Sequence, residues 1–168
     1  MNAYQEFRDG KDEFFAGHPQ SPLTPDQKSA FKGLAYFDEN PVLRFELPIE
    51  RFPEGDTIEV QTSTGLKQTY RRYGRLRFKV GGQPAELTLY AGQNGYFLPF
   101  VDALAGVETY PAGRYLEPEP LSGDRFLVDF NLAYNPYCAY NELWSCPLTP
   151  AENRLKVPIR AGEKLYPK

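Results

Sequence analysis

Hydrophobic and polar residues alternate along the chain with two different periods, and the change falls near residue 40. Between residues 3 and 16, Tyr4, Phe7, Phe14 and Phe15 fall on about one face of a helix with charged residues between them. This spacing predicts a first helix, which Gly10 weakens because glycine is a poor helix former.

A second, shorter helix is indicated by the stretch SPLTPDQKSAFKGL. Thr24 is placed to cap its N-terminus, Pro25 suits the first helical position, Asp26 suits the first turn, and Gln27 can complete a capping box. We expect this helix to end near Gly33.

After residue 40 the apolar residues alternate with polar ones, as in half-buried strands. Gly81 and Gly82 separate two such runs, and glycine accepts the positive φ that a tight hairpin turn requires. The alternating runs lie at residues 43–47, 58–61, 75–80, 83–90, 95–100, 113–117, 125–130 and, in the sequence LKVPIR, 155–160.

The order of these elements predicts a mainly β fold, an antiparallel β-barrel or sandwich of about seven to nine short strands with an N-terminal helical arm. A length of 168 residues fits a single domain spanning residues 1–168. Within it we expect a helical arm at 1–40 and a β domain at 41–168, which includes a long irregular segment at 131–154.

Net charge and hydropathy limit the partners that the chain would bind. The formal charge is −3, which argues against nucleic acid because phosphate binding requires clustered Lys and Arg. The sequence has one basic cluster, which consists of Arg71, Arg72, Arg75 and Arg77. Because these residues alternate with apolar ones, we interpret them as the solvent-exposed face of a hairpin.

No apolar run approaches the roughly 18 residues that a membrane-spanning helix needs, so no membrane partner is expected. The first residues, MNAYQEFRDGKDEFF, lack the basic start and apolar stretch of a secretory signal. We therefore expect a cytoplasmic protein, and the sequence leaves its oligomeric state open.

The segment DFNLAYNPYCAYNELWSCPLTPAENRL, residues 129–155, holds both cysteines, the single tryptophan, four asparagines and three prolines. Asp129 and Asn131 flank Phe130 at the end of a predicted strand, so their side chains leave the same face. Together with Tyr134 and Asn135 they either bind a ligand or hold the loop through backbone hydrogen bonds.

Seven residues separate Cys138 from Cys146, which leaves a disulfide and a pair of free thiols as alternatives. Zinc normally requires four ligands, often in short C-x-x-C pairs, and these are missing, so we expect no metal and no cofactor. The only histidine, His18, lies far along the chain, which disfavours a cysteine or serine nucleophile with a histidine base.

Carboxylates offer the alternative of an enzyme, hydrolase-like, in which two acids facing each other across a cleft divide acid and base roles. The competing interpretation is a structural network in which Arg114 and Arg154 pair with these acids. The carboxylates in question are Asp102, Glu108, Asp129, Glu152 and Glu163.

The stretch ETYPAGRYLE also supports two interpretations. Pro111 and Gly113 favour a turn across which Glu108 and Arg114 would pair. Alternatively, Arg114, with Tyr110 and Tyr115 nearby, would present a planar cation and phenols to an acidic or aromatic small molecule.

Several longer segments of the sequence resemble those of a known family. GVETYPAGRYLE, DFNLAYNPYCAY, CPLTPAENRL and IRAGEK, preceded by KDEFF, SPL and FKGLAYF, are similar in order and spacing to the family called domain of unknown function 1684. The resemblance covers nearly the whole chain. It implies no activity, cofactor or partner, and His18 is not part of the pattern.

Three hypotheses follow. The first is a small-molecule-binding β-barrel domain with its pocket near residues 129–155, and the second is the carboxylate enzyme acting in the same cleft. In the third, the segment is a purely structural lid in which Trp144 plugs the core. The candidate ligand-binding residues are Asp129, Asn131, Tyr134, Asn135, Arg114, Glu108, Tyr110 and Glu152.

Overall fold

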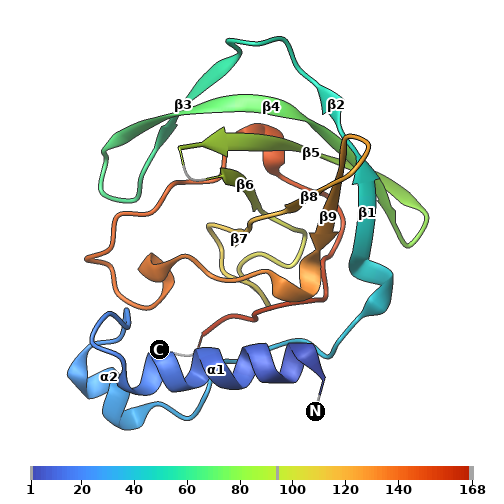
Figure 1. The fold of residues 1–168 in the computed structure, drawn as a ribbon. Helices are drawn as coiled ribbons and strands as arrows, with labels where there is room; N and C mark the ends of the chain where they lie inside the picture. The colour runs from blue at the N-terminus through green and yellow to red at the C-terminus, as the bar shows by residue number, and fades with distance from the viewer. Residues whose placement is uncertain (1, 94, 167–168) are drawn as a thin grey trace.

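A computed structural model describes residues 2–93 and 95–166 and arranges them as two antiparallel sheets above an N-terminal helix (Figure 1). One sheet has three strands in the order β1-β9-β8. The other has six, in the order β2-β4-β5-β6-β7 with β3 paired to β4. In the described residues neither sheet closes on itself, so the fold is sandwich-like; the predicted mainly β class is confirmed in this form.

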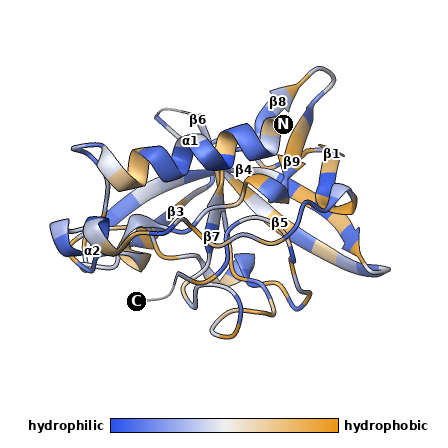
Figure 2. Ribbon diagram, turned by 90° about the horizontal axis from the view of Figure 1, so that it is seen from below, coloured by the Kyte–Doolittle hydropathy of each residue, from blue (hydrophilic) through white to orange (hydrophobic). Residues whose placement is uncertain are grey.

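Both predicted helices form. Helix α1, Ala3–Gly17, begins at Asn2, whose side chain accepts a hydrogen bond from the backbone N–H of Gln5. Helix α2, Pro25–Ala30, has the predicted capping box between Thr24 and Gln27. Figure 2, seen from below, shows α1 in front of the strands with mostly hydrophilic residues along it, as expected for a helix that buries only one narrow face.

The six-stranded sheet is built on the long hairpin of β4, Lys67–Val80, and β5, Gln83–Gly92. Gly81 and Gly82 form its turn with φ of +56° and +82°, the left-handed values that favour glycine. The remaining strands of this sheet are β2, Glu50–Arg51; β3, Thr57–Gln61; β6, Gly95–Phe100; and β7, Arg114–Leu116.

The three-stranded sheet pairs β1, Arg44–Pro48, with β9, Arg125–Asp129, and β9 with β8, Glu119–Leu121. The register places Arg44 opposite Asp129 at one end and Pro48 opposite Arg125 at the other. The apolar side chains of both sheets meet in one core, whose most buried members include Leu76, Leu89, Leu98, Phe100, Phe126, Phe130 and Ile159.

A second, smaller cluster attaches α1 to the rest of the molecule. Phe15 of α1 packs edge-on against Tyr140, with ring centroids 5.0 Å apart, and Leu23 and Ala139 complete the buried set. The helical arm is therefore docked on residues of the irregular segment through aromatic contacts.

Short 3-10 helices punctuate the irregular parts of the chain: η1, Pro41–Leu43; η2, Phe130–Leu132; η3, Tyr137–Ala139; and η4, Ala151–Asn153. Because the backbone between them has few ladder partners, side chains satisfy many of its polar groups. Asn153 is an example: its amide donates to the carbonyls of Thr88 and Pro99 and accepts from the N–H of Thr88, at 2.8 to 2.9 Å.

The predicted strand at 155–160 is wrong. Leu155 donates to the carbonyl of Val101, but Pro158 has no N–H to continue a ladder, and the N–H of Ile159 is bound instead by the carboxylate of Asp102. The alternation still marks burial, since Val157 and Ile159 lie in the core.

Candidate functional site

A groove of about 700 Å³ lies between α1 and the irregular segment. Its lining is mainly aromatic and apolar, with a few polar groups, which is typical of small-molecule sites. The residues that line it are Phe7, Gly10, Lys11, Tyr115, Glu117, Tyr134, Pro136, Tyr137, Trp144, Ser145, Cys146 and Pro147.

Helix α1 is fixed as one wall of the groove by an ion pair. Lys11 pairs with Glu163, a carboxylate that is 1% exposed, and its ammonium lies 4.9 Å from the centre of the Tyr134 ring. Glu163 also accepts from the hydroxyl of Tyr140 at 2.6 Å and from the N–H of Asn135 at 3.1 Å. The charge of Lys11 is therefore neutralised inside the protein.

The floor of the groove is formed by Tyr115 of β7 and Tyr134. The two residues exchange backbone hydrogen bonds of 2.8 and 3.0 Å, and their rings meet edge-on at 5.8 Å. Tyr134 donates its hydroxyl to Glu117. Burial, followed by this hydrogen bond, raises the pKa of Tyr134, so the phenol stays protonated and donates to Glu117.

The opposite wall, residues 144–147, is held by the turn that joins β3 to β4. Ser63 donates to the carbonyls of both Cys146, at 2.8 Å through its N–H, and Trp144, at 3.0 Å through its hydroxyl. Trp144 lines the groove against the ring of Tyr137 and is 38% exposed. The prediction that Trp144 plugs the core is therefore wrong.

A smaller hollow of about 240 Å³ shares Phe7, Glu117 and Tyr134 with the groove and adds Asp129 to its lining. Asp129 is nonetheless occupied by other groups. Its two oxygens accept from the hydroxyl of Tyr4 at 2.5 Å and from the backbone and side-chain N–H groups of Asn131, at 3.1 and 2.9 Å.

The side-chain amides of Asn131 and Asn135 form hydrogen bonds mainly with backbone groups. The amide of Asn131 accepts from the N–H of Asn40 at 2.8 Å and donates to its carbonyl at 2.9 Å, which ties the arm to the end of β9. Asn135 donates to the carbonyl of Lys164 at 3.0 Å, while its side-chain oxygen is buried and has no partner among the described residues. These amides support the irregular segment.

Arg114 is placed inside the protein, 1% exposed, and does not reach the groove. Its guanidinium donates to the carbonyls of Ile159, Ala161 and Glu163, at 2.5 to 3.0 Å, and lies 3.7 Å from Asp102. Burial lowers the pKa of Arg114 to about 10, so it remains charged at neutral pH.

The predicted pairing of Arg114 with Glu108 does not form, because Glu108 lies 3.7 Å from Arg160 on the surface. Tyr110 is half-buried, with its hydroxyl 3.8 Å from the sulfur of Cys138, and is not among the residues that line the groove.

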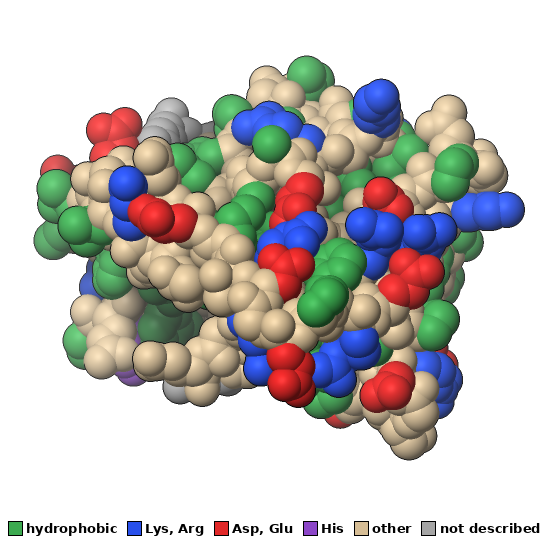
Figure 3. Space-filling model, turned by 90° about the horizontal axis from the view of Figure 1, so that it is seen from above, with side chains coloured by type: hydrophobic (Ala, Val, Ile, Leu, Met, Phe, Trp, Pro, Cys, Tyr) green, Lys and Arg blue, Asp and Glu red, His purple; other side chains and the backbone are tan. Residues whose placement is uncertain are grey.

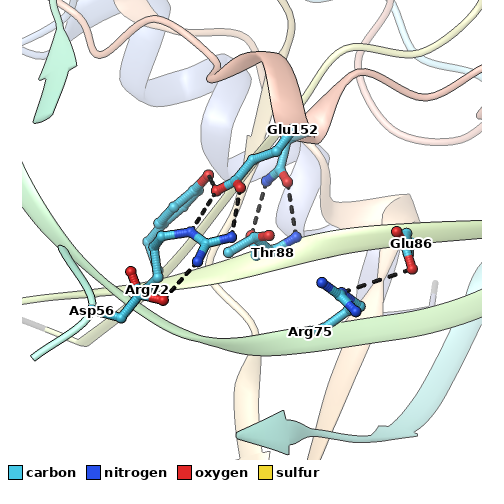
Figure 4. Close-up of polar contacts among 8 residues, drawn as sticks. Asp56, Arg72, Arg75, Glu86, Thr88 and Glu152 are labelled. Atoms are coloured by element: carbon cyan, nitrogen blue, oxygen red, sulfur yellow. Dashed lines mark hydrogen bonds and ion pairs between the residues drawn. The ribbon is translucent and has the colours of Figure 1, made fainter. Parts of the chain in front are cut away.

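Glu152 binds Arg72 through two hydrogen bonds of 3.1 and 2.7 Å and accepts from Tyr90 at 2.5 Å; Figure 4 shows this cluster on the β4–β5 hairpin. Burial alone would raise the pKa of Glu152, but the hydrogen bonds from Arg72 and Tyr90 outweigh it and lower that pKa below its ordinary value. The guanidinium of Arg72 also donates a hydrogen bond of 2.7 Å to the carboxylate of Asp56.

Each of the five carboxylates considered for catalysis thus has its own cation. Asp102 lies beside Arg114 and Asp129 beside Arg44, while the other three are paired as described above. No two of them face each other across the groove as an acid and base pair would, and the arrangement is that of a structural network.

The basic cluster of β4 is interleaved with acids. Arg72, Arg75 and Arg77 lie within 4 Å of carboxylates of Asp56, Glu50, Glu86 or Glu152. Figure 3 shows blue and red side chains side by side over this face. The face therefore carries mixed charge.

Four of the twelve residues that line the groove were not predicted from the sequence. Phe7, Gly10 and Lys11 come from α1, and Glu117 follows β7. The pattern of α1 marks Phe7 as part of an apolar face, but nothing in the spacing shows that this helix lies against residues more than a hundred positions away. The other lining residues, apart from Tyr115, belong to the segment at residues 129–155 that was singled out from the sequence.

The part of the chain that the structure describes contains neither a metal-binding cluster nor a helix able to cross a membrane. In residues 2–93 and 95–166, no group of three or more His, Cys, Asp or Glu side chains could hold a metal ion. Within the same residues, no helix combines the length and the apolar character that crossing a bilayer would need.

Comparison with known proteins gives a family and a solved relative. The solution NMR structure of an uncharacterized protein of Haloarcula marismortui is similar, with a TM-score of 0.72 and 37% sequence identity, over 95% of this chain and 91% of that one. No curated protein matches the sequence. A family model described as "Protein of unknown function (DUF1684)" matches residues 29–164, and the chain belongs to this family.

Proposed function

We propose that this protein binds a small molecule in the groove between α1 and residues 134–147. The observation that carries the proposal is the size and lining of the groove: about 700 Å³, with five aromatic side chains and few polar ones. Ligand pockets in proteins are commonly of this size and apolar, with a few polar groups that orient the ligand.

The polar groups of the groove support a ligand with an aromatic or aliphatic body. Lys11 is neutralised by Glu163, and Glu117 already accepts from Tyr134, so few charged atoms are free to bind a highly charged ligand. The faces of Tyr137 and Trp144 offer stacking surface instead. The wall made by α1 is held by Lys11 and by Phe15, so the groove is largely preformed.

The test is a thermal-shift screen of the wild-type protein against a library of small metabolites. A ligand that binds only the native state stabilises it by about 2.7 kcal/mol at roughly 100 times its Kd. Compounds that raise the melting temperature are then titrated against two variants at position 10.

Gly10 lines the groove, and a Cβ atom built there meets nothing within 4 Å. The variant Gly10→Leu is therefore expected to fold and to occupy part of the groove. Gly10→Ala is the matched control, because it adds only a methyl group. Compounds that stabilise wild type and Gly10→Ala but not Gly10→Leu support the proposal; equal stabilisation of all three, or no active compound, contradicts it.

A further inference from the structure

The two cysteines lie together at the wall of the groove. Cys138 belongs to η3 and Cys146 to the wall at residues 144–147, and both are free thiols that are 7% exposed. The backbone N–H of Cys138 donates to the sulfur of Cys146 at 3.2 Å. Of the two, Cys146 lines the groove, while Cys138 lies behind it next to the hydroxyl of Tyr110.

The contact between the thiols favours one negative charge on the pair. A hydrogen bond from Cys146 lowers the pKa of Cys138 to about 6, and the same bond raises the pKa of Cys146. The pair therefore holds one proton and one thiolate at neutral pH; the negative charge rests mainly on Cys138 and moves to Cys146 when the proton passes between the two sulfurs. The N–H of Cys138 is placed to stabilise that charge when it resides on Cys146.

We propose that Cys138 and Cys146 form a redox-active dithiol that reduces low-molecular-weight disulfides entering the groove. The proposal rests on the proposed function only in that the groove admits a small molecule. Cys146 is the attacking residue because it faces the groove, and Cys138 is the resolving residue because it contacts Cys146 from behind.

The reaction is thiol–disulfide exchange in two steps. After its proton has passed to Cys138, the thiolate of Cys146 forms a bond to one sulfur of the substrate RSSR, the substrate S–S bond breaks, and RS⁻ leaves. Cys138 then loses its proton and attacks the sulfur of Cys146, which releases the second RS⁻. One RS⁻ takes the proton that Cys138 loses, and the other takes a proton from water, because the pair starts with a single proton. The dithiol is oxidised to a Cys138–Cys146 disulfide, and RSSR is reduced to two RSH.

The surroundings suit this chemistry better than the role of two inert core residues. Structural buried cysteines usually lie among apolar groups that raise the thiol pKa, whereas this pair is hydrogen-bonded to a backbone N–H and neighbours a phenol. The segment around Cys146 is anchored to the β3–β4 turn by hydrogen bonds with Ser63 and between Ser145 and Thr62, which keeps Cys146 at the wall of the groove next to Cys138.

The test uses the aromatic disulfide 5,5′-dithiobis(2-nitrobenzoate) with the native full-length protein. Wild type is expected to release two coloured thiols per chain, to retain no adduct and to lose two hydrogens by intact mass. Cys138→Ser is expected to keep one adduct on Cys146, because the resolving thiol is missing. Cys146→Ser is expected to react at least tenfold more slowly than wild type.

Unreactive thiols in the native wild-type protein, which react only after denaturation, would overturn the proposal, as would stable adducts on both cysteines. Circular dichroism and the melting temperature of each serine variant establish that it is folded. The outcome is independent of the ligand screen: reactive thiols with no library ligand overturn only the binding proposal, and library ligands with inert thiols overturn only this one.

Discussion

Replacing Asn153 by Ala should remove a bridge between two strands at a point where their backbones no longer pair. Strands β5 and β6 pair only where Tyr90–Gly92 faces Gly95–Phe97. At Thr88 and Pro99 they have separated, and the fully buried amide of Asn153 spans the gap with three hydrogen bonds.

The magnitude follows from the groups left behind. The Asn153→Ala substitution would leave the N–H and carbonyl of Thr88 and the carbonyl of Pro99 without that partner, and an unsatisfied buried group costs about 1 to 3 kcal/mol. Because two of them are acceptors that relaxation or water can partly satisfy, we expect a total loss of about 3 to 5 kcal/mol. This is a large part of the roughly 5 to 15 kcal/mol that stabilises a typical domain.

The loss is measured by urea unfolding followed by far-UV circular dichroism, with a fall in melting temperature of roughly 6 to 20 °C as a second readout. Asn141→Ala is the control, since Asn141 is only half-buried and accepts one exposed hydrogen bond, from Leu143. A loss below about 1 kcal/mol for Asn153→Ala, with the Thr88 amide still protected from hydrogen exchange, would refute the reasoning.

Three further substitutions test other features. Gly10→Ala in the interior of α1 should stabilise the protein by about 1 kcal/mol, a rise of roughly 2 to 4 °C in melting temperature, because alanine is the better helix former. Gly162→Ala should cost at least about 2 kcal/mol more in urea unfolding than Gly55→Ala: both have positive φ, +78° and +84°, but only at Gly162 does the new Cβ meet backbone oxygens, at 2.7 Å. The pKa of Glu152 is lowered on folding, so its ionised form stabilises the native state above the unfolded pKa near 4.5, and this contribution is lost as pH falls through the lower folded value. Glu152→Gln should therefore cost about 1 kcal/mol near pH 7, and urea unfolding from pH 7 to about 3 should show the difference from wild type disappearing at acid pH.

Features that depend on neighbouring residues could be predicted from the sequence. The capping box of Thr24 and Gln27 and the turn at Gly81–Gly82 are closed by residues a few positions apart, so their chemistry is complete within the local stretch. The alternation of residues 155–160 was misleading because alternation reports which side chains are buried. It does not report whether a partner strand exists. Here the N–H of Ile159 donates to Asp102, and the carbonyl of Ile159 accepts from Arg114.

The groove could be predicted only in part, because it joins residues far apart in the chain. Tyr134 and Cys146 belong to a segment whose composition is unusual, so this side of the groove could be predicted from the sequence. Lys11 reaches the groove through its pair with Glu163, more than 150 positions away, and such docking leaves no periodic signal. Of the residues proposed as ligand-binding, Tyr134 and Asp129 line a hollow. Arg114 and Asn131 instead form hydrogen bonds with backbone carbonyls.

The density of amides in residues 129–155 has a physical cause that also explains the groove. A segment without a ladder partner must satisfy its own backbone groups and those it crosses, and Asn side chains carry both a donor and an acceptor for that purpose. Asn131, Asn135 and Asn153 each bond to backbone in this way. Since the amides hold the segment in place, its aromatic side chains can line the groove: Tyr137 packs edge-on against Phe15 of α1, and Trp144 packs against Tyr137 and stays partly exposed.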